Sequence, residues 1–329
     1  LQYGRLVVIY SSAGRLRHER ALVRLFDWIG THYWFPGIQA PYNERFCERL
    51  APEVVSRLTE LDGGRLALPP GPAPRRGLCY LPGEADRLRR TLGWDTDFQM
   101  IGMPRFYATW RDTLTEIGGP VLEEELRKLG LEPDAKGLVT VILTAPNYFW
   151  YRHPGAFQDM LDIIVHRVRD RFPDAPILLK YKPQMKRFFT ELEARYDDPK
   201  VRLTGCALAV LSTRSRFAIS VQESSGVFDF LTTGVPVIEY GLYSDAWTAL
   251  FPCKSSWNGL PGLTLAGSEA ELVARLDDIA EGRLVGVDPA RLASYLGHRE
   301  DLSPLLDGPV RAGPLSAAPA PIADAGDAE

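Results

Sequence analysis

Residues 220–238, SVQESSGVFDFLTTGVPVI, decide the fold of this chain. The pattern predicts the end of a buried strand, a polar turn and a short helix over 224–232. Gly234 then ends the helix, and 235–240 reads as a second buried strand. A strand, a short helix and a parallel strand in immediate succession are typical of α/β domains.

The turn in this stretch has the residues of an anion site. Ser224, Ser225 and Gly226 stand where the helix begins, and a helix N-terminus offers free N–H groups with a partial positive charge. Glycine lets the backbone approach a ligand closely. We therefore expect a phosphate to bind here. The alternative is that the two serines only cap a structural helix.

Length and composition bound the class of protein. The 329 residues suffice for two domains, and 45% hydrophobic with 24% charged residues is an ordinary globular balance. A net charge of −4 without a basic stripe argues against a nucleic-acid-binding protein. The 4 cysteines form no CxxC pair, so we expect no metal site and a reducing, cytoplasmic setting. No apolar run approaches the ~20 residues of a membrane span.

Apolar runs alternate with helical patterns through the second part of the chain. Strands are predicted at 138–143, 176–181, 201–203, 217–220 and 235–240, with helices at 154–172, 207–212, 268–281 and 289–296. Such alternation predicts a parallel sheet covered on both faces, with ligands at the carboxyl ends of its strands. In the first part, strands are expected at 6–10, 77–81 and 98–103, and the aromatic, proline-broken segment 33–42 is expected to be a loop.

These patterns predict four regions. Residues 1–113 form an N-terminal Rossmann-like domain and 114–290 a second Rossmann-like domain. A C-terminal helix region covers 291–307, and 308–329 form a disordered tail rich in proline, alanine and glycine. Because the sequence opens at Leu1, only a few residues before an apolar strand, we expect the first domain to be truncated.

Two further strand-end loops carry polar residues. Thr144, Asn147 and Tyr148 follow the strand 138–143, and they could contact a base or a sugar; the alternative is that the aromatic residues pack into the core. Lys182 follows the strand 176–181 and could neutralise a diphosphate. The alternative is that the lysines of this loop are solvated surface charges.

Several motifs together resemble one enzyme family. The segment 180–183, KYKP, and the segments 223–226, ESSG, and 234–238, GVPVI, are similar to motifs of glycosyltransferases with the two-Rossmann GT-B fold. The group that they most resemble assembles bacterial surface carbohydrates and includes capsule Kdo, sialyl and glycerophosphate transferases. Residues 81–87 and 101–106 resemble the end of the first domain of such enzymes. Lys182 stands where the family has a histidine.

The resemblance implies a fold, an activity and a set of site residues. The second domain would bind a nucleotide sugar, and the first would present a surface-polysaccharide or glycolipid acceptor, without metal or further cofactor. The implied donor contacts are Lys182, Glu223, Ser224, Ser225, Gly226, Thr144, Asn147, Tyr148 and Arg105. The acceptor proton would pass to His18, Glu19 or Glu44. Peripheral contact with the inner membrane would fit such an acceptor.

Two other functions remain open at this point. A sugar-nucleotide epimerase of the UDP-N-acetylglucosamine 2-epimerase type shares the architecture, although Lys182 replaces a histidine that such an enzyme would use. A non-catalytic binding domain could keep the fold and lose the chemistry. Products formed without an acceptor would identify the epimerase, and binding without turnover would identify the binding domain.

Overall fold

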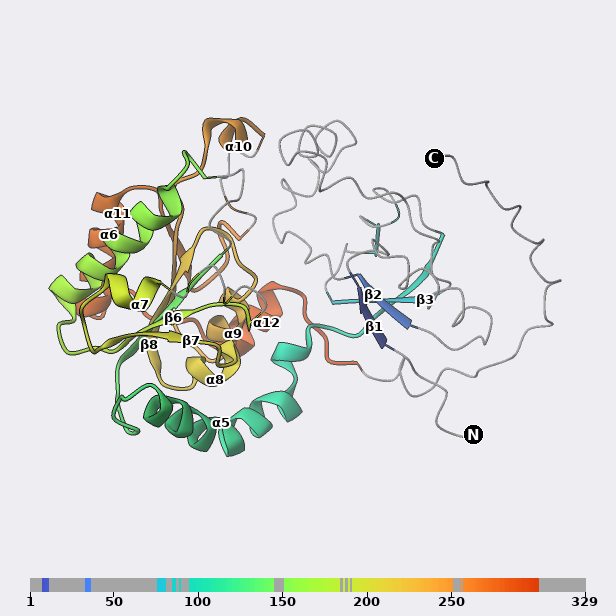
Figure 1. The fold of residues 1–329 in the computed structure, drawn as a ribbon. Coiled ribbons are helices and arrows are strands. Elements are labelled where there is room, and N and C mark those ends of the chain that lie inside the picture. Colours follow the sequence, from blue (N-terminus) through green and yellow to red (C-terminus); the bar gives the residue numbers. More distant parts are fainter. Residues whose placement is uncertain are drawn as a thin grey trace, which may run out of the picture.

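The computed structural model describes residues 8–11, 33–36, 76–80, 85–86, 89, 95–144, 151–183, 186, 189, 191–250, 255 and 257–301. These residues form two parallel β-sheets with their helices (Figure 1), which confirms the expected α/β class with two parallel-sheet units. In the described part of the chain, no helix is both long and apolar enough to cross a membrane.

The first sheet has four strands in the order of the chain. They are β1 (Val8–Ser11), β2 (Tyr33–Pro36), β3 (Arg76–Cys79) and β4 (Asp97–Met100), and every neighbouring pair is parallel. The prediction that 33–42 is a loop was therefore wrong for its first four residues. Aromatic side chains favour strands, and Tyr33, Trp34 and Phe35 fill the first three of the four positions of β2.

The second sheet has six parallel strands in the order β10-β9-β8-β5-β6-β7. Most of its residues are apolar and buried, as expected for a sheet that helices cover on both faces. Its strands are β5 (Leu138–Ile142), β6 (Ile177–Lys180), β7 (Val201–Thr204), β8 (Ser215–Val221), β9 (Val237–Tyr240) and β10 (Leu263–Ala266).

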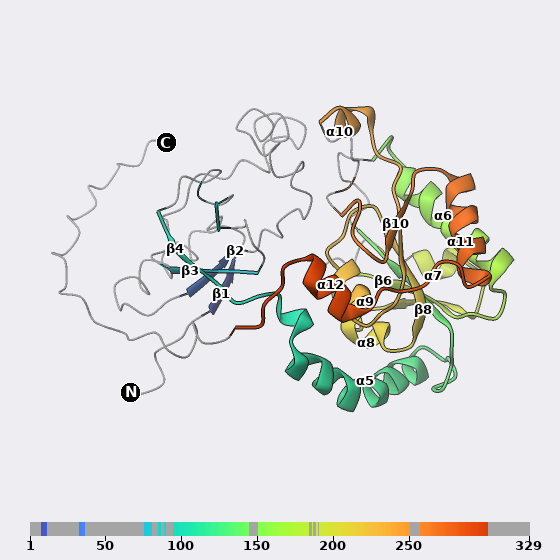
Figure 2. The same ribbon diagram turned by 180° about the vertical axis from the view of Figure 1, so that it is seen from behind.

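Helices cover both faces of this sheet (Figures 1 and 2). On one face, α6 (Ala156–Arg171) packs beside α11 (Glu269–Ala280). The Ser268 side chain caps α11 by accepting from the N–H of Glu271. The other face is covered by α5 (Ala108–Lys128), α8 (Leu208–Ser212), α9 (Val227–Leu231) and α12 (Pro289–Tyr295). The short helices α7 (Leu192–Arg195) and α10 (Asp245–Leu250) complete the unit.

Two segments of the chain join the sheets. A 3-10 turn, η1 (Pro104–Phe106), follows β4 and leads into α5. Helix α5 begins at Ala108, so one helix spans the position where the sequence placed the start of the second domain. In the other direction, α12 ends at Tyr295, and residues 297–301 run without helix or strand to the edge of the first sheet, where the N–H of Asp301 bonds to the carbonyl of Ile101.

Candidate functional site

The strand order of the second sheet reverses between β5 and β8. From β5 the chain moves outward to β6 and β7, and it then returns to place β8 on the other side of β5. In sheets of this kind, ligands bind outside the carboxyl ends of the strands at such a reversal. Residue Thr144 follows β5, and the turn 222–226 follows β8. The structure thus places the turn that the sequence singled out at the topological switch point.

Gln222 redirects the chain at the end of β8. Its φ of 63° makes it the one non-glycine residue with positive φ in the described part of the chain. The side chain is fully buried: Nε2 donates to the carbonyl of Leu242 at 3.1 Å, while Oε1 has no partner among the described residues. Strain of this kind costs about 1–3 kcal/mol and is concentrated at functional sites.

The turn leaves backbone donors available. The N–H of Gly226 bonds to Oγ of Ser224 at 3.2 Å, so this serine stabilises the turn itself. In contrast, the N–H groups of Ser224 and Ser225 donate to no acceptor in the part of the chain that the structure describes. Both serines are half-buried. A Cβ on Gly226 would lie 2.5 Å from Cδ1 of Leu208, so any larger residue here would displace that half-buried side chain.

Arg105 reaches this turn from η1. Its Nη1 donates to the carbonyl of Ser225 at 2.7 Å, and its Nε lies 3.4 Å from Oδ1 of Asp229. The arginine side chain is 34% exposed and that of Asp229 only 10%. Burial raises the pKa of Asp229, and the charges of Arg105 and Lys180 oppose that rise. The guanidinium group is therefore fixed against the turn and the helix that follows it, and part of it remains open to a ligand.

Of the two lysines near β6, the buried one is directed into the protein. Lys180 ends β6, and its Nζ donates to the carbonyls of Tyr181 and, at 3.3 Å, Gly205. Burial lowers the pKa of Lys180. Lys182, the residue implied by the resemblance, is exposed. The sequence analysis did not select Lys180 as a site residue, although a lysine that ends an apolar strand is a usable signal.

The other expected donor contacts fall into two groups. Thr144 is buried and already engaged, because its Oγ1 bonds to the hydroxyl of Tyr151 at 2.6 Å and to the carbonyl of Val221 at 2.9 Å. It thereby ties the end of β5 to the end of β8. Asn147 and Tyr148 lie outside the described residues, as do His18, Glu19 and Glu44.

A buried acid lies in β9, the strand beside β8 in the second sheet. Glu239, fully buried in β9, accepts hydrogen bonds from the hydroxyls of Tyr243 and, at 2.7 Å, Ser255. Burial raises the pKa of Glu239 to about 8, and the charge of Glu223 adds to this rise. Glu223, whose charge acts on Glu239, is the first residue of the ESSG turn. The signal that the sequence offered was a lone acid in an apolar strand.

The comparisons with known proteins find only distant likenesses. No protein-family model matches the chain, and none of the curated proteins does. Among solved structures, the glycotransferase of kitacinnamycin is similar at a TM-score of 0.41 and 17% identity, over 84% of this chain and 67% of that one. WaaG, a glycosyltransferase involved in lipopolysaccharide biosynthesis, is similar at 0.40 and 12%, over 85% and 75%. A UDP-glucosyltransferase from Polygonum tinctorium gives 0.41 and 11%, over 89% and 68%.

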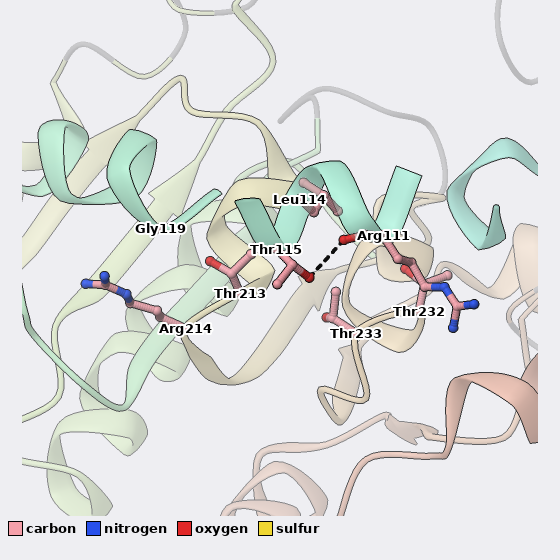
Figure 3. Close-up of a pocket in the computed structure, with 8 residues that line it drawn as sticks. All are labelled: Arg111, Leu114, Thr115, Gly119, Thr213, Arg214, Thr232 and Thr233. Atoms are coloured by element: carbon pink, nitrogen blue, oxygen red, sulfur yellow. Dashed lines mark hydrogen bonds between the residues drawn. The ribbon is translucent and has the colours of Figure 1, made fainter. Parts of the chain in front are cut away.

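A separate hollow of about 430 Å³ lies at the opposite, amino-terminal edge of the second sheet (Figure 3). Its threonine hydroxyls donate to carbonyls of their own helices and turns, and the side chains of Arg111 and Arg214 point away from each other. It is lined by Arg111, Leu114, Thr115, Gly119, Thr213, Arg214, Thr232 and Thr233. The described residues contain no group of three metal-binding side chains there or elsewhere.

Proposed function

We propose that this protein is a glycosyltransferase that binds a nucleotide-activated sugar at the turn 223–226. The observation that carries the proposal is the position of Arg105. Its guanidinium group is fixed on the Ser225 carbonyl at the switch point of the second sheet, in a turn where two backbone N–H groups have no acceptor among the described residues. Free N–H groups and a fixed arginine are the elements that hold a phosphate.

The chemistry that follows is displacement at the anomeric carbon. An acceptor oxygen forms the new bond to that carbon, the bond from the carbon to the phosphate oxygen breaks, and its electron pair leaves with the nucleotide. The acceptor proton passes to a base of the first domain, for which His18, Glu19 and Glu44 are the candidates. Arg105 and the N–H groups of the turn stabilise the charge that develops on the departing phosphate.

The finer assignment follows the motif resemblance. We propose that the acceptor is a surface polysaccharide or a glycolipid, and that transfer needs no metal. The donor contacts are Arg105, Ser224, Ser225 and Gly226, with Glu223 and Lys182 at the margins of the site. A lipid-linked acceptor would bring the protein to the inner face of the bacterial membrane.

The lysine at position 182 favours one alternative. A lysine keeps a positive charge but has little acid–base ability near neutral pH, so a domain that binds nucleotide sugars without turnover is the second candidate. The two functions share the nucleotide site and differ in product formation.

The experiment is a thermal-shift screen against CMP, CDP, UDP, GDP and their sugar conjugates. A ligand that binds only the folded state raises the melting temperature. We expect one nucleotide class to do so, and the Ser224→Ala/Ser225→Ala variant to lose most of the shift. Ser294→Ala, an exposed serine on α12, is the control. Binding followed by sugar transfer supports the transferase, binding without transfer supports the alternative, and the absence of any shift contradicts both.

A further inference from the structure

Two segments run side by side where the chain passes between the sheets (Figures 1 and 2). One is residues 101–108, and the other is residues 297–301, which follow α12. Three hydrogen bonds join them: the Met103 N–H to Nδ1 of His298 at 3.0 Å, the Asp301 N–H to the Ile101 carbonyl at 3.3 Å, and the Ala108 N–H to Oε2 of Glu300 at 3.1 Å.

His298 is the centre of this contact. Its ring lies 5.1 Å from the ring of Phe106 and 6.0 Å from that of Tyr107. Gly102 makes room for it: φ is +79°, and a Cβ there would lie 2.1 Å from the carbonyl oxygen of Arg299 and 2.6 Å from Cε1 of His298. Only glycine fits such a site, because both the conformation and the space exclude a side chain.

The hydrogen bond to Met103 fixes the charge state of the ring. Nδ1 accepts a hydrogen bond from the Met103 N–H, so it carries no proton of its own, whereas an imidazolium has two donors and no acceptor. Burial lowers the pKa of His298, Glu300 raises it and Arg111 lowers it. Among the remaining neighbours, Tyr107 stays protonated near neutral pH, because burial, Glu300 and Asp301 raise its pKa to about 12.

The same segment carries Arg105 to the nucleotide site. Arg105 follows Met103 by two residues in η1, and Phe106, which contacts the His298 ring, is buried in the core against the second sheet. The position of the Met103 backbone therefore limits where the Arg105 guanidinium can lie. That guanidinium donates to the carbonyl of Ser225 at 2.7 Å.

We propose that His298 is a positioning residue of the nucleotide site: as a neutral imidazole it holds the Met103 backbone, and through it Arg105, on the turn that binds the phosphate. Protonation of His298 removes the acceptor for Met103 and releases this constraint. The role in ligand binding rests on the proposed function, whereas the link between His298 and Arg105 can be measured without any ligand.

The first test is a double-mutant cycle on the full chain, read as urea midpoints at pH 7.5 and pH 5.5. Arg105→Met is made in the wild type, in His298→Ala and in His298→Asn, whose side-chain oxygen can accept from Met103 but does not titrate. We expect Arg105→Met to lower the midpoint at pH 7.5 in the wild type and in His298→Asn. The lowering should disappear in His298→Ala, and in the wild type it should be smaller at pH 5.5 than at pH 7.5, because the protonated fraction of His298 rises as the pH falls.

The proposal would be overturned if Arg105→Met shifted the urea midpoint equally in the wild type, His298→Ala and His298→Asn at both pH values. It would also be overturned if Arg105→Met caused no shift in the wild type. If His298→Ala does not fold, the wild type and His298→Asn still decide, because only in the wild type should the coupling weaken at pH 5.5. The second test is the affinity for the nucleotide found by the screen. It should fall at least threefold from pH 7.5 to pH 5.5 in the wild type and less than twofold in His298→Asn, a comparison that cancels protonation of the nucleotide itself. If no nucleotide binds, the proposed function fails. The double-mutant cycle then still tests the link between His298 and Arg105, because it needs no ligand.

Discussion

Arg105 Nε and Asp229 Oδ1 lie 3.4 Å apart and join the segment between the two sheets to the helix that follows the ESSG turn. The aspartate is almost completely buried, so the arginine supplies the charge that offsets its desolvation. Because the same guanidinium donates to the Ser225 carbonyl, one side chain fixes the turn and presents positive charge to it.

Replacing Arg105 should weaken nucleotide binding without unfolding the protein. Arg105→Met keeps most of the aliphatic stem and removes a charge-assisted contact to phosphate, so we expect affinity to fall about tenfold, equivalent to about 1.4 kcal/mol. Calorimetric titration measures it. Arg291→Met, at an exposed position of α12, should leave affinity unchanged. Equal losses in the two variants would show that the effect is one of net charge.

Gly226→Ala should destabilise the turn by steric conflict. The new Cβ would meet Cδ1 of Leu208 at 2.5 Å and Oγ of Ser224 at 3.3 Å. Because Leu208 must move within a packed cluster, we expect a loss of about 1–3 kcal/mol in the free energy of unfolding. The double variant Gly226→Ala/Leu208→Ala removes the obstacle. Its loss in the free energy of unfolding should therefore be smaller than the sum of the losses in the two single variants. Strict additivity in urea unfolding would contradict this account of the glycine.

Gly286→Ala should be more damaging than a change at a solvent-facing glycine. A Cβ at Gly286 would lie 1.5 Å from the carbonyl oxygen of Gly234, the residue that ends the quoted helix. Backbone cannot move aside as a side-chain tip can, so we expect about 3 kcal/mol or more of destabilisation. Gly282 has φ of +73° and open space, so Gly282→Ala should cost only the backbone strain, about 1–2 kcal/mol. A lower melting temperature for Gly282→Ala than for Gly286→Ala would contradict the close packing of Gly286 on Gly234.

Glu239 should make stability fall as pH rises. Its pKa in the folded protein is raised to about 8 from the ordinary value of 4.5, so the folded state holds a proton that the unfolded state has released between these values. The stabilisation is complete below pH 4.5 and is lost progressively up to pH 8, with a slope of at most about 1.4 kcal/mol per pH unit. Urea unfolding of Glu239→Gln should lack this slope. An unchanged slope would assign the pH dependence to other groups.

The sequence predicted the elements whose pattern is local. Five strands of the second sheet and helices α6, α11 and α12 follow from apolar periodicity and capping residues such as Ser268, whereas the edge strand β10 was not predicted. The turn 223–226 follows from its polar residues between two apolar runs. The strand β2 was missed because an aromatic segment with two prolines resembles a loop by composition. The contacts of Arg105 with Asp229 and of Met103 with His298 join residues far apart in sequence, and no local pattern records such pairs.

The central claim is that the turn at the switch point binds the phosphate of a nucleotide, and calorimetric titration of the wild type and of Ser224→Ala/Ser225→Ala with CMP, CDP, UDP and GDP tests it most directly. We expect one nucleotide to bind the wild type at a single site and to bind the double variant at least several-fold more weakly, with both proteins folded. Binding of equal strength in the two proteins would show that the serine hydroxyls take no part in the site, because the backbone N–H groups and Arg105 remain in the double variant, and no binding to the wild type would contradict the claim outright.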